Sequence, residues 1–323
     1  MKNLTRKMIT AGMAATMAAS LGIAANAEEA TYKVGICQLI QHEALDAATQ
    51  GFQDALTEKL GDRVEFDVQN ASGESVNCST IINGFVSDQV DLILANATGA
   101  LQAAVAGTSD IPILGTAVTD YATALDIDDW TGTVGGNVSG TSDCAPLDQQ
   151  AAMILELVPE AKTVGMLYCS AEPNSEYQVN VVTEALKELN PDLEIKNYTF
   201  ADSNDISSVA TSATECDVVY IPTDNTAANN TEAINNVMEP AGVPVIAGEV
   251  GICQGCGIAT LSISYYDLGY TTGEMAYEIL EEGADISTME VQYAPNVTKQ
   301  YMADRCEKFG ITVPDDYEAI EAE

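Results

Sequence analysis

Short apolar runs alternate with longer amphipathic segments along most of the chain. A strand buried on both faces of a parallel sheet forms a continuous apolar run, whereas a helix that covers the sheet repeats its apolar positions with the helical period. The first set of expected strands lies at 32–37, 64–68, 91–95, 111–114 and, more weakly, 133–138, with helices at 43–60 and 75–86. This alternation predicts βα units and a parallel sheet.

The same alternation begins again near residue 163. The second set of expected strands lies at 163–168, 194–200, 217–221 and 244–247, with helices at 175–189, 205–213 and 226–238. The expected elements end with a strand at 257–264, a helix at 267–280, a strand at 290–293 and a helix at 298–309. Each set has the length of an ordinary domain. We therefore predict an α/β fold with two doubly wound parallel-sheet lobes.

The first 27 residues differ from the rest of the chain. Lys2, Arg6 and Lys7 are followed by an uncharged apolar run at 8–24 and by the sequence ANA at 25–27. This order is typical of a cleaved secretory signal. The alternative is a membrane anchor, for which the apolar run is somewhat short. We expect a signal peptide at 1–27 and an exported protein.

The charge of the chain disfavours one class of partner. The sequence holds 12 Lys and Arg against 49 Asp and Glu, a formal net charge of −37. A protein that binds nucleic acid needs a basic surface that displaces counterions from phosphate. We therefore expect no nucleic-acid partner, and anionic membrane surfaces are disfavoured for the same reason.

The expected export makes disulfides possible among the eight cysteines, because disulfides persist in oxidising compartments. Sequence cannot choose among the pairings that eight cysteines allow. Cys253 and Cys256 are the only close pair, and we expect them in a loop between Gly251 and Gly257. A zinc site would need a second such pair or a nearby His, and His42 is the only His. The sequence favours a local disulfide or free thiols and predicts no metal site.

Polar side chains follow several of the expected strands, and ligands of open α/β sheets bind at the carboxyl ends of strands. The candidate ligand-binding residues at these ends are Gln38, His42, Thr98, Ala100, Thr119, Asp120, Glu172, Asn174, Ser175, Asp224, Asn225 and Glu249. Thr98 and Thr119 suit a carboxylate, together with helix N-terminal N–H groups, and Asp224 or Glu249 suits an ammonium. The set therefore fits a zwitterion such as an amino acid. Each polar residue alone is also an ordinary helix cap.

The common enzyme templates are not found. No Gly-x-Gly-x-x-Gly follows the first strand, and the chain contains no Gly-x-x-x-x-Gly-Lys phosphate loop or Gly-x-Ser-x-Gly elbow. A Ser-His-Asp triad would have to use His42, for which no partner is visible. We predict no catalytic residue, no cofactor and no enzymatic activity.

The turns resemble those of the TrpX-like group of ABC-transporter substrate-binding proteins. The resemblance rests on VGICQ at 34–38, HEALD at 42–46, GF at 51–52, ATGA at 97–100, AVTD at 117–120, NVSGTSD at 137–143, LYCSAEPNS at 167–175, IPTDNT at 221–226, GE at 248–249 and YYDLGYTTG at 265–273. It covers nearly all of the chain after the signal. The sequence departs from the group at Glu43 and Tyr121, where relatives usually have Pro.

This resemblance implies a type I periplasmic-binding fold with two lobes, a multi-strand hinge and a ligand in the cleft. With that fold we assign 28–140 plus 258–286 to one lobe and 141–257 plus 287–323 to the other. It implies an amino-acid ligand, with tryptophan, tyrosine or phenylalanine favoured, and an ABC permease in the membrane as partner. We expect a monomer in the periplasm or at the cell surface. The residues that the resemblance implies as ligand contacts are Gln38, Thr98, Thr119, Asp120, Asn174, Asp224 and Glu249.

Other functions stay open at this stage. The same two-lobed module also serves as a ligand sensor for a membrane receptor. A nucleoside or sugar ligand is less favoured, because Trp130 is the only Trp and Arg is scarce. An exported enzyme on an α/β scaffold is the third class.

Overall fold

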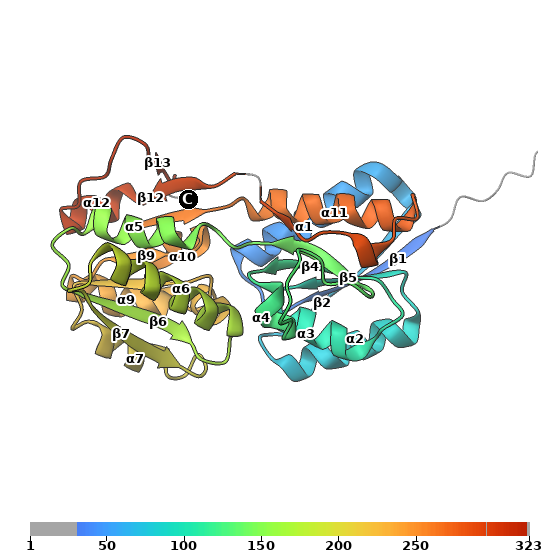
Figure 1. Ribbon diagram of the computed structural model, residues 1–323, viewed down its shortest axis with the longest axis horizontal. Coiled ribbons are helices and arrows are strands. Elements are labelled where there is room, and N and C mark those ends of the chain that lie inside the picture. The colour runs from blue at the N-terminus through green and yellow to red at the C-terminus, as the bar shows by residue number, and fades with distance from the viewer. Residues whose placement is uncertain (1–30, 295, 322–323) are drawn as a thin grey trace, which may run out of the picture. The chain divides into compact units, whose positions relative to one another are not determined.

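A computed structural model of the protein describes residues 31–294 and 296–321. The predicted signal peptide at 1–27 lies outside the described residues. Two sheets with helices on both faces form the described part (Figure 1). No helix within these residues is long and apolar enough to cross a membrane.

The first sheet has six parallel strands in the order β11-β5-β4-β3-β1-β2. Its strands are β1 (Tyr32–Gln38), β2 (Val64–Asn70), β3 (Leu92–Asn96), β4 (Ile113–Val118), β5 (Val138–Ser142) and β11 (Gln292–Tyr293). The central strands β3 and β4 are buried throughout, as their continuous apolar runs predict. Strand β5 begins at residue 138, where the weak prediction at 133–138 ends.

Helices cover both faces of the first sheet. They are α1 (Glu43–Leu60), α2 (Ser75–Asp88), α3 (Thr98–Gly107), α4 (Tyr121–Leu125) and α11 (Tyr265–Leu280), with short 3-10 turns η1 (Gly61–Arg63) and η2 (Ile286–Thr288). Helices α1 and α11 lie side by side although they are far apart in sequence (Figure 1). Glycines permit this contact, because a Cβ added to Gly269 would lie 1.9 Å from the Ala48 carbonyl oxygen.

The second sheet has seven strands in the order β13-β12-β10-β9-β8-β6-β7. Its strands are β6 (Thr163–Cys169), β7 (Glu194–Phe200), β8 (Val218–Ile221), β9 (Val245–Ala247), β10 (Ala259–Ser262), β12 (Thr298–Tyr301) and β13 (Glu318–Ala319). Its helices are α5 (Leu147–Leu157), α6 (Pro173–Leu189), α7 (Ile206–Ala213), α8 (Asn225–Ala228), α9 (Thr231–Ala241), α10 (Val250–Cys256) and α12 (Ala303–Phe309). All neighbouring strands are parallel except β10 and β12, which are antiparallel.

The apolar core follows this layering. Two buried clusters lie in the first lobe, one around Phe85 and Ile93 and one around Phe52 and Leu94. Two more lie in the second lobe. Each sheet therefore has a core on both of its faces, which is the arrangement of a doubly wound fold.

The chain passes between the lobes three times, and this changes the predicted boundaries. It enters the second lobe after β5, returns from β10 to α11, and leaves again between β11 and β12. Helix α11 packs on the first lobe as the assignment of 258–286 expects. However, β10 pairs with β9 in the second sheet, and β11 pairs with β5 in the first. Local periodicity does not reveal which sheet a strand joins, because pairing is a tertiary choice.

Three local predictions are wrong. The Cys253–Cys256 segment is not a loop but helix α10, because the Glu249 side chain accepts hydrogen bonds from the first free N–H groups of the helix. The expected helix at 298–309 is divided into β12, which pairs with β10, and α12. The expected helix at 226–238 is divided into α8 and α9 around Asn230.

All eight cysteines are free thiols. Cys253 and Cys256 are both buried on the same helix, and burial raises the pKa of the Cys256 thiol to about 12. Of the two alternatives that the sequence favoured, the structure has the free thiols.

Candidate functional site

Residues that follow strands of both sheets line one enclosed cavity. The lining residues are His42, Leu45, Ala117, Thr119, Asp143, Asn174, Thr223, Asp224, Asn225, Ala228, Glu249 and Tyr265. The volume that the centre of a water molecule can reach inside it is about 10 Å³. That is room for about one water molecule. An amino acid therefore enters only when the residues of the two lobes separate.

Two open grooves adjoin this cavity. One shares Asn174 and Asn225 with it and offers about 450 Å³ to the centre of a water molecule. The other shares His42, Ala228 and Glu249 and offers about 530 Å³. The enclosed cavity thus shares parts of its wall with two open grooves.

The lobes contact one another directly at the cavity. The Thr119 hydroxyl of the first lobe lies 3.4 Å from the Thr223 hydroxyl of the second. The Gln178 amide of α6 donates to both hydroxyls, at 3.4 Å and 2.6 Å. His42 Nε2 of the first lobe lies 3.1 Å from Asn225 Oδ1 of the second. These contacts are neutral and few, so they can be exchanged for contacts to a ligand at small cost.

Asp143 and Tyr265 occupy two of the segments that connect the lobes. Asp143 is the first residue after β5, and Tyr265 is the first residue of α11. The Tyr265 hydroxyl donates to Asp143 Oδ2 at 2.9 Å. Asp143 Oδ1 is buried and has no hydrogen-bond partner among the described residues. Burial raises the pKa of the Asp143 carboxyl, and the hydroxyl of Tyr265 opposes that rise.

Asp224 is the N-cap of α8, and its carboxylate is well supplied with donors. Oδ1 accepts from the Ala227 N–H at 2.8 Å, and Oδ2 accepts from the Cys169 N–H at 2.6 Å and from the Ser175 hydroxyl at 2.8 Å. These donors favour the charged carboxylate. Burial and the nearby charge of Glu172 both act against these donors, and they raise the pKa of Asp224 to about 8.

Glu249 caps α10 in the same way. Its carboxylate accepts from the Gly251 N–H at 2.6 Å and from the Ile252 N–H. Burial raises the pKa of Glu249 to about 7, against the effect of these two donors. The charges of Glu43 and Asp143 add to the rise.

Three carboxyl groups therefore share one cavity without a permanent cation among the lining residues. His42 is the only lining residue that can become positive, and burial lowers the pKa of its imidazole. Buried charges are stable only when they are paired. Burial thus favours the protonated carboxyl groups, and a cationic group of a ligand would favour their charged forms by pairing with them.

The sequence profile of a family described as ABC transporter substrate binding protein matches residues 33–321. The chain belongs to this family. A substrate-binding protein of this kind binds a small-molecule ligand and works with an ABC permease; it is not an enzyme. Proteins of the family are exported to the periplasm or the cell surface.

Named relatives agree with this family. The chain is 37% identical over 252 residues to a tyrosine-binding protein of Clostridioides difficile (strain R20291), covering 77% of this chain and 72% of the relative. A crystal structure of an ABC domain in complex with L-Trp from Streptococcus pneumonia has a TM-score of 0.85 at 29% identity and covers 90% of this chain and 100% of that one.

A third relative is solved in a different state. It is a substrate-binding protein with adhesive properties from Clostridium difficile, in a ligand-free, open structure. Its TM-score is 0.69 at 33% identity, with 91% of this chain and 100% of that chain covered. The structure of this protein therefore resembles the L-Trp complex more closely than the open structure, although its sequence is slightly closer to that of the open structure.

Six of the twelve predicted site residues line the cavity of this substrate-binding protein. They are His42, Thr119, Asn174, Asp224, Asn225 and Glu249. Each follows a strand whose carboxyl end points to the cavity, which is the placement that the strand-end rule expects.

The other six predicted residues do not line the cavity. Gln38 is buried and fixes the next loop, because its amide donates to the Ile40 carbonyl and to Asp46. Thr98 and Ala100 are buried in the first turn of α3. Asp120 caps α4 by accepting the N–H of Thr123.

Glu172 and Ser175 support the cavity from behind. The Glu172 carboxylate accepts from the backbone N–H groups of Asn225 and Thr226, so it holds the start of α8 against the start of α6. The Ser175 hydroxyl donates to Asp224. Both residues therefore act on the lining through other residues.

Sequence reasoning missed three polar lining residues, namely Asp143, Thr223 and Tyr265. The strand-end rule could have found Asp143 and Tyr265, because they follow β5 and β10. The rule did not reach Asp143, because the fifth strand was expected to end at 138, whereas β5 ends at Ser142. Tyr265 directly follows the strand expected at 257–264 but was not taken as a candidate.

Proposed function

We propose that this protein binds an aromatic amino acid between its lobes and delivers it to an ABC permease. The observation that carries the proposal is the cavity with three buried carboxyl groups and no permanent cation, which suits an ammonium. The preference for an aromatic side chain is supported by the relatives, one named as tyrosine-binding and one solved with L-Trp.

The proposed ligand contacts are the six predicted residues that line the cavity together with the three that sequence reasoning missed. The hydroxyl and amide groups of Thr119, Asn174, Thr223 and Asn225 suit the carboxylate of the ligand. The apolar part of the lining comes from Leu45, Ala117 and Ala228. Binding replaces the direct contacts between the lobes with contacts to the ligand. The ligand shifts the equilibrium between open and closed lobes only by the difference in its affinity for the two states.

The proposed working unit is a monomer exported with removal of residues 1–27. One chain supplies both sides of the cavity, so a second copy is not needed to complete the site. Mass analysis of the protein secreted by the expressing cell tests the export step, with a mature chain that starts at Glu28 as the expected result.

A thermal-shift screen of the purified protein tests the ligand class. The protein is first unfolded and refolded to remove any ligand carried through purification. L-tyrosine, L-tryptophan or L-phenylalanine should raise the melting temperature, because a ligand that binds only the folded state stabilises it by mass action. A rise with sugars or nucleosides, and none with any amino acid, would contradict the proposal.

A further inference from the structure

We infer that Asp143, held in place by Tyr265, is the group that receives the ammonium of the ligand. This inference rests on the proposed function and names the specificity-determining residue of its site. Asp143 was not among the residues that the sequence pattern indicated, because it lies on a segment between lobes and not at a predicted strand end.

The three acids of the cavity differ in how their oxygens are occupied. Both oxygens of Asp224 and both oxygens of Glu249 accept hydrogen bonds from helix N–H groups or neighbouring backbone. These two acids already serve as caps of α8 and α10. Asp143 caps no helix. The Tyr265 hydroxyl donates to its Oδ2 at 2.9 Å, and the Thr119 hydroxyl also favours the charged form of the Asp143 carboxyl.

The free oxygen of Asp143 is the exceptional group of the cavity. Asp143 is 5% exposed, and its Oδ1 lacks a partner among the residues that the structure describes. A buried acceptor without a donor is costly, and the cost is larger for a charged group. An ammonium brings several N–H donors and a compensating charge, so it removes this cost through a short charge-assisted hydrogen bond.

The position of Asp143 and Tyr265 between the lobes allows the ammonium contact to persist when the lobes separate. Asp143 follows β5 where the chain leaves the first lobe, and Tyr265 begins α11 where the chain has just returned. The pair therefore joins two of the three connecting segments. An ammonium bound there keeps its partner when the lobes separate, whereas Asn174, Thr223 and Asn225 belong to the second lobe and reach the ligand only when the lobes meet.

Tyr265 acts as a positioning residue. It is 5% exposed, and its hydroxyl donates to Oδ2, which leaves Oδ1 without a partner among the described residues; both residues line the cavity. Loss of the hydroxyl should loosen the carboxylate and weaken the ammonium contact without removing the charge.

The test compares two ligands that differ only in the ammonium. Titration calorimetry gives the Kd of L-tyrosine and of 3-(4-hydroxyphenyl)propionate; if L-tryptophan binds more tightly, L-tryptophan and indole-3-propionate are compared instead. Wild type should prefer the amino acid by about 100-fold, the scale of a buried charge pair that loses one partner. Asp143→Asn should reduce this preference to below about tenfold. Tyr265→Phe should give an intermediate value.

Matched controls are Asp224→Asn and Glu249→Gln. Both can weaken binding of the two ligands because they disturb helix caps, but they should reduce the preference for the amino acid less than Asp143→Asn does. Asp143→Asn is nearly isosteric, and an amide still accepts from the Tyr265 hydroxyl, so its melting temperature without ligand should not fall. If this variant fails to fold, the preference measured in Tyr265→Phe decides in its place.

The outcomes separate the inference from the proposed function. A preference that is unchanged in folded Asp143→Asn, or that is lost in Asp224→Asn or Glu249→Gln instead, would overturn the assignment of Asp143 while the protein remains an amino-acid binder. Wild type that binds none of the aromatic amino acids would overturn the proposed function and the inference with it.

Discussion

Two aspartates at opposite ends of strand β8 accept the same number of hydrogen bonds, but their pKa values are shifted in opposite directions. Asp217 precedes the strand, is exposed, and accepts from the N–H groups of Lys162 and Thr163 and from the Thr163 hydroxyl. Asp224 follows the strand, is buried, and also accepts three hydrogen bonds. The hydrogen bonds lower the pKa of Asp217, whereas burial raises the pKa of Asp224 to about 8.

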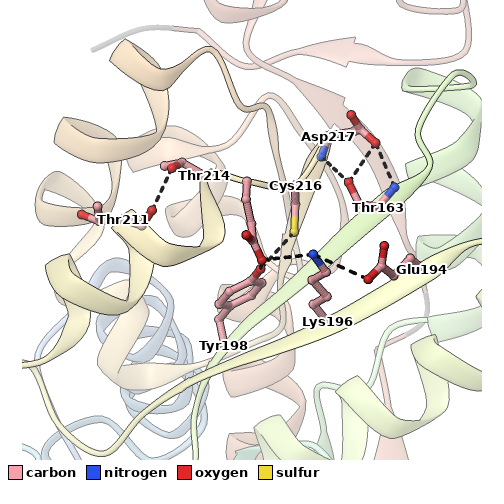
Figure 2. A network of polar contacts seen from close by, with 9 residues as sticks. Thr163, Glu194, Lys196, Tyr198, Thr211, Thr214, Cys216 and Asp217 are labelled. Carbon is pink, nitrogen blue, oxygen red and sulfur yellow. Dashed lines mark hydrogen bonds and ion pairs between the residues drawn. The ribbon is translucent and has the colours of Figure 1, made fainter.

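The surroundings of the two acids explain the difference. Figure 2 shows the network near Asp217, in which the Lys196 ammonium lies 3.1 Å from Glu215 Oε1 and the Tyr198 hydroxyl donates to the same oxygen at 2.7 Å. Glu215 and Asp217 are both exposed. The cavity at the other end contains acids without a permanent cation among its lining residues. The hydrogen bonds of an acid therefore do not by themselves indicate a binding site. The indication is that the acid is buried and has no cation beside it.

The largest expected effect is on ligand affinity. Asp224→Ala should weaken binding of the aromatic amino acid by more than tenfold, because it removes a cavity acid and releases the start of α8. Asp217→Ala, at the other end of the same strand, should leave the Kd within about twofold. Titration calorimetry of both variants checks this contrast. An unchanged affinity in Asp224→Ala would remove Asp224 from the site.

The second effect is a dependence on pH. In the ligand-free protein the pKa values of Glu249 (about 7) and Asp224 (about 8) lie above those of an unfolded chain. At low pH both carboxyl groups bind a proton, whereas the ammonium of the ligand favours their deprotonated forms. Binding should therefore release protons, and affinity should rise by about tenfold between pH 6 and pH 8. The groups that face these acids are His42, Glu43, Asp143 and Glu172.

The same shifts predict the opposite trend for the stability of the ligand-free protein. A carboxyl whose pKa is raised by folding stabilises the fold at low pH, and this contribution is lost as pH rises through its folded pKa. The melting temperature without ligand should thus fall between pH 5 and pH 8. Glu249→Gln should flatten the fall near pH 7. A ligand-free melting temperature that increases steadily across this range would contradict the buried-acid description.

The fold was largely predictable because its signal is local. The helix expected at 43–60 and the strand expected at 194–200 have those bounds in the structure. Strand β5 was harder, since its sequence VSGTS lacks an apolar run and Gly135, Gly136 and Gly140 adopt positive φ around it. The sheet that β10 and β11 join depends on pairing across the molecule, which local periodicity does not contain.

The site was predictable only in part, for a related physical reason. The strand-end rule brought together His42, Thr119, Asp224 and other lining residues because it describes parallel sheets in general. It could not separate lining residues from their supports, such as Glu172, since both are polar groups at helix starts. Asp143 was missed because the strand before it lacks an apolar run and was expected to end at 138, whereas β5 ends at Ser142.

The smallest expected effect is on stability at the exposed end of β8. Asp217→Ala should lower the melting temperature by about 2–4 °C, because water replaces the lost carboxylate at the exposed N–H groups of Lys162 and Thr163. Tyr198→Phe should change it less, since the Tyr198 hydroxyl bonds to an exposed Glu215. Thermal unfolding followed by circular dichroism measures both. A large loss in either variant would mean that this network, and not only the core, determines folding.

A crystal structure of the protein grown with L-tyrosine or L-tryptophan tests the central claim most directly. The account predicts the amino acid in the interlobe cavity, with its ammonium nitrogen about 2.7–2.9 Å from Asp143 Oδ1 and its carboxylate toward the hydroxyl and amide groups of the opposite wall. A ligand bound outside this cavity, or one whose carboxylate faces the three acids, would contradict it.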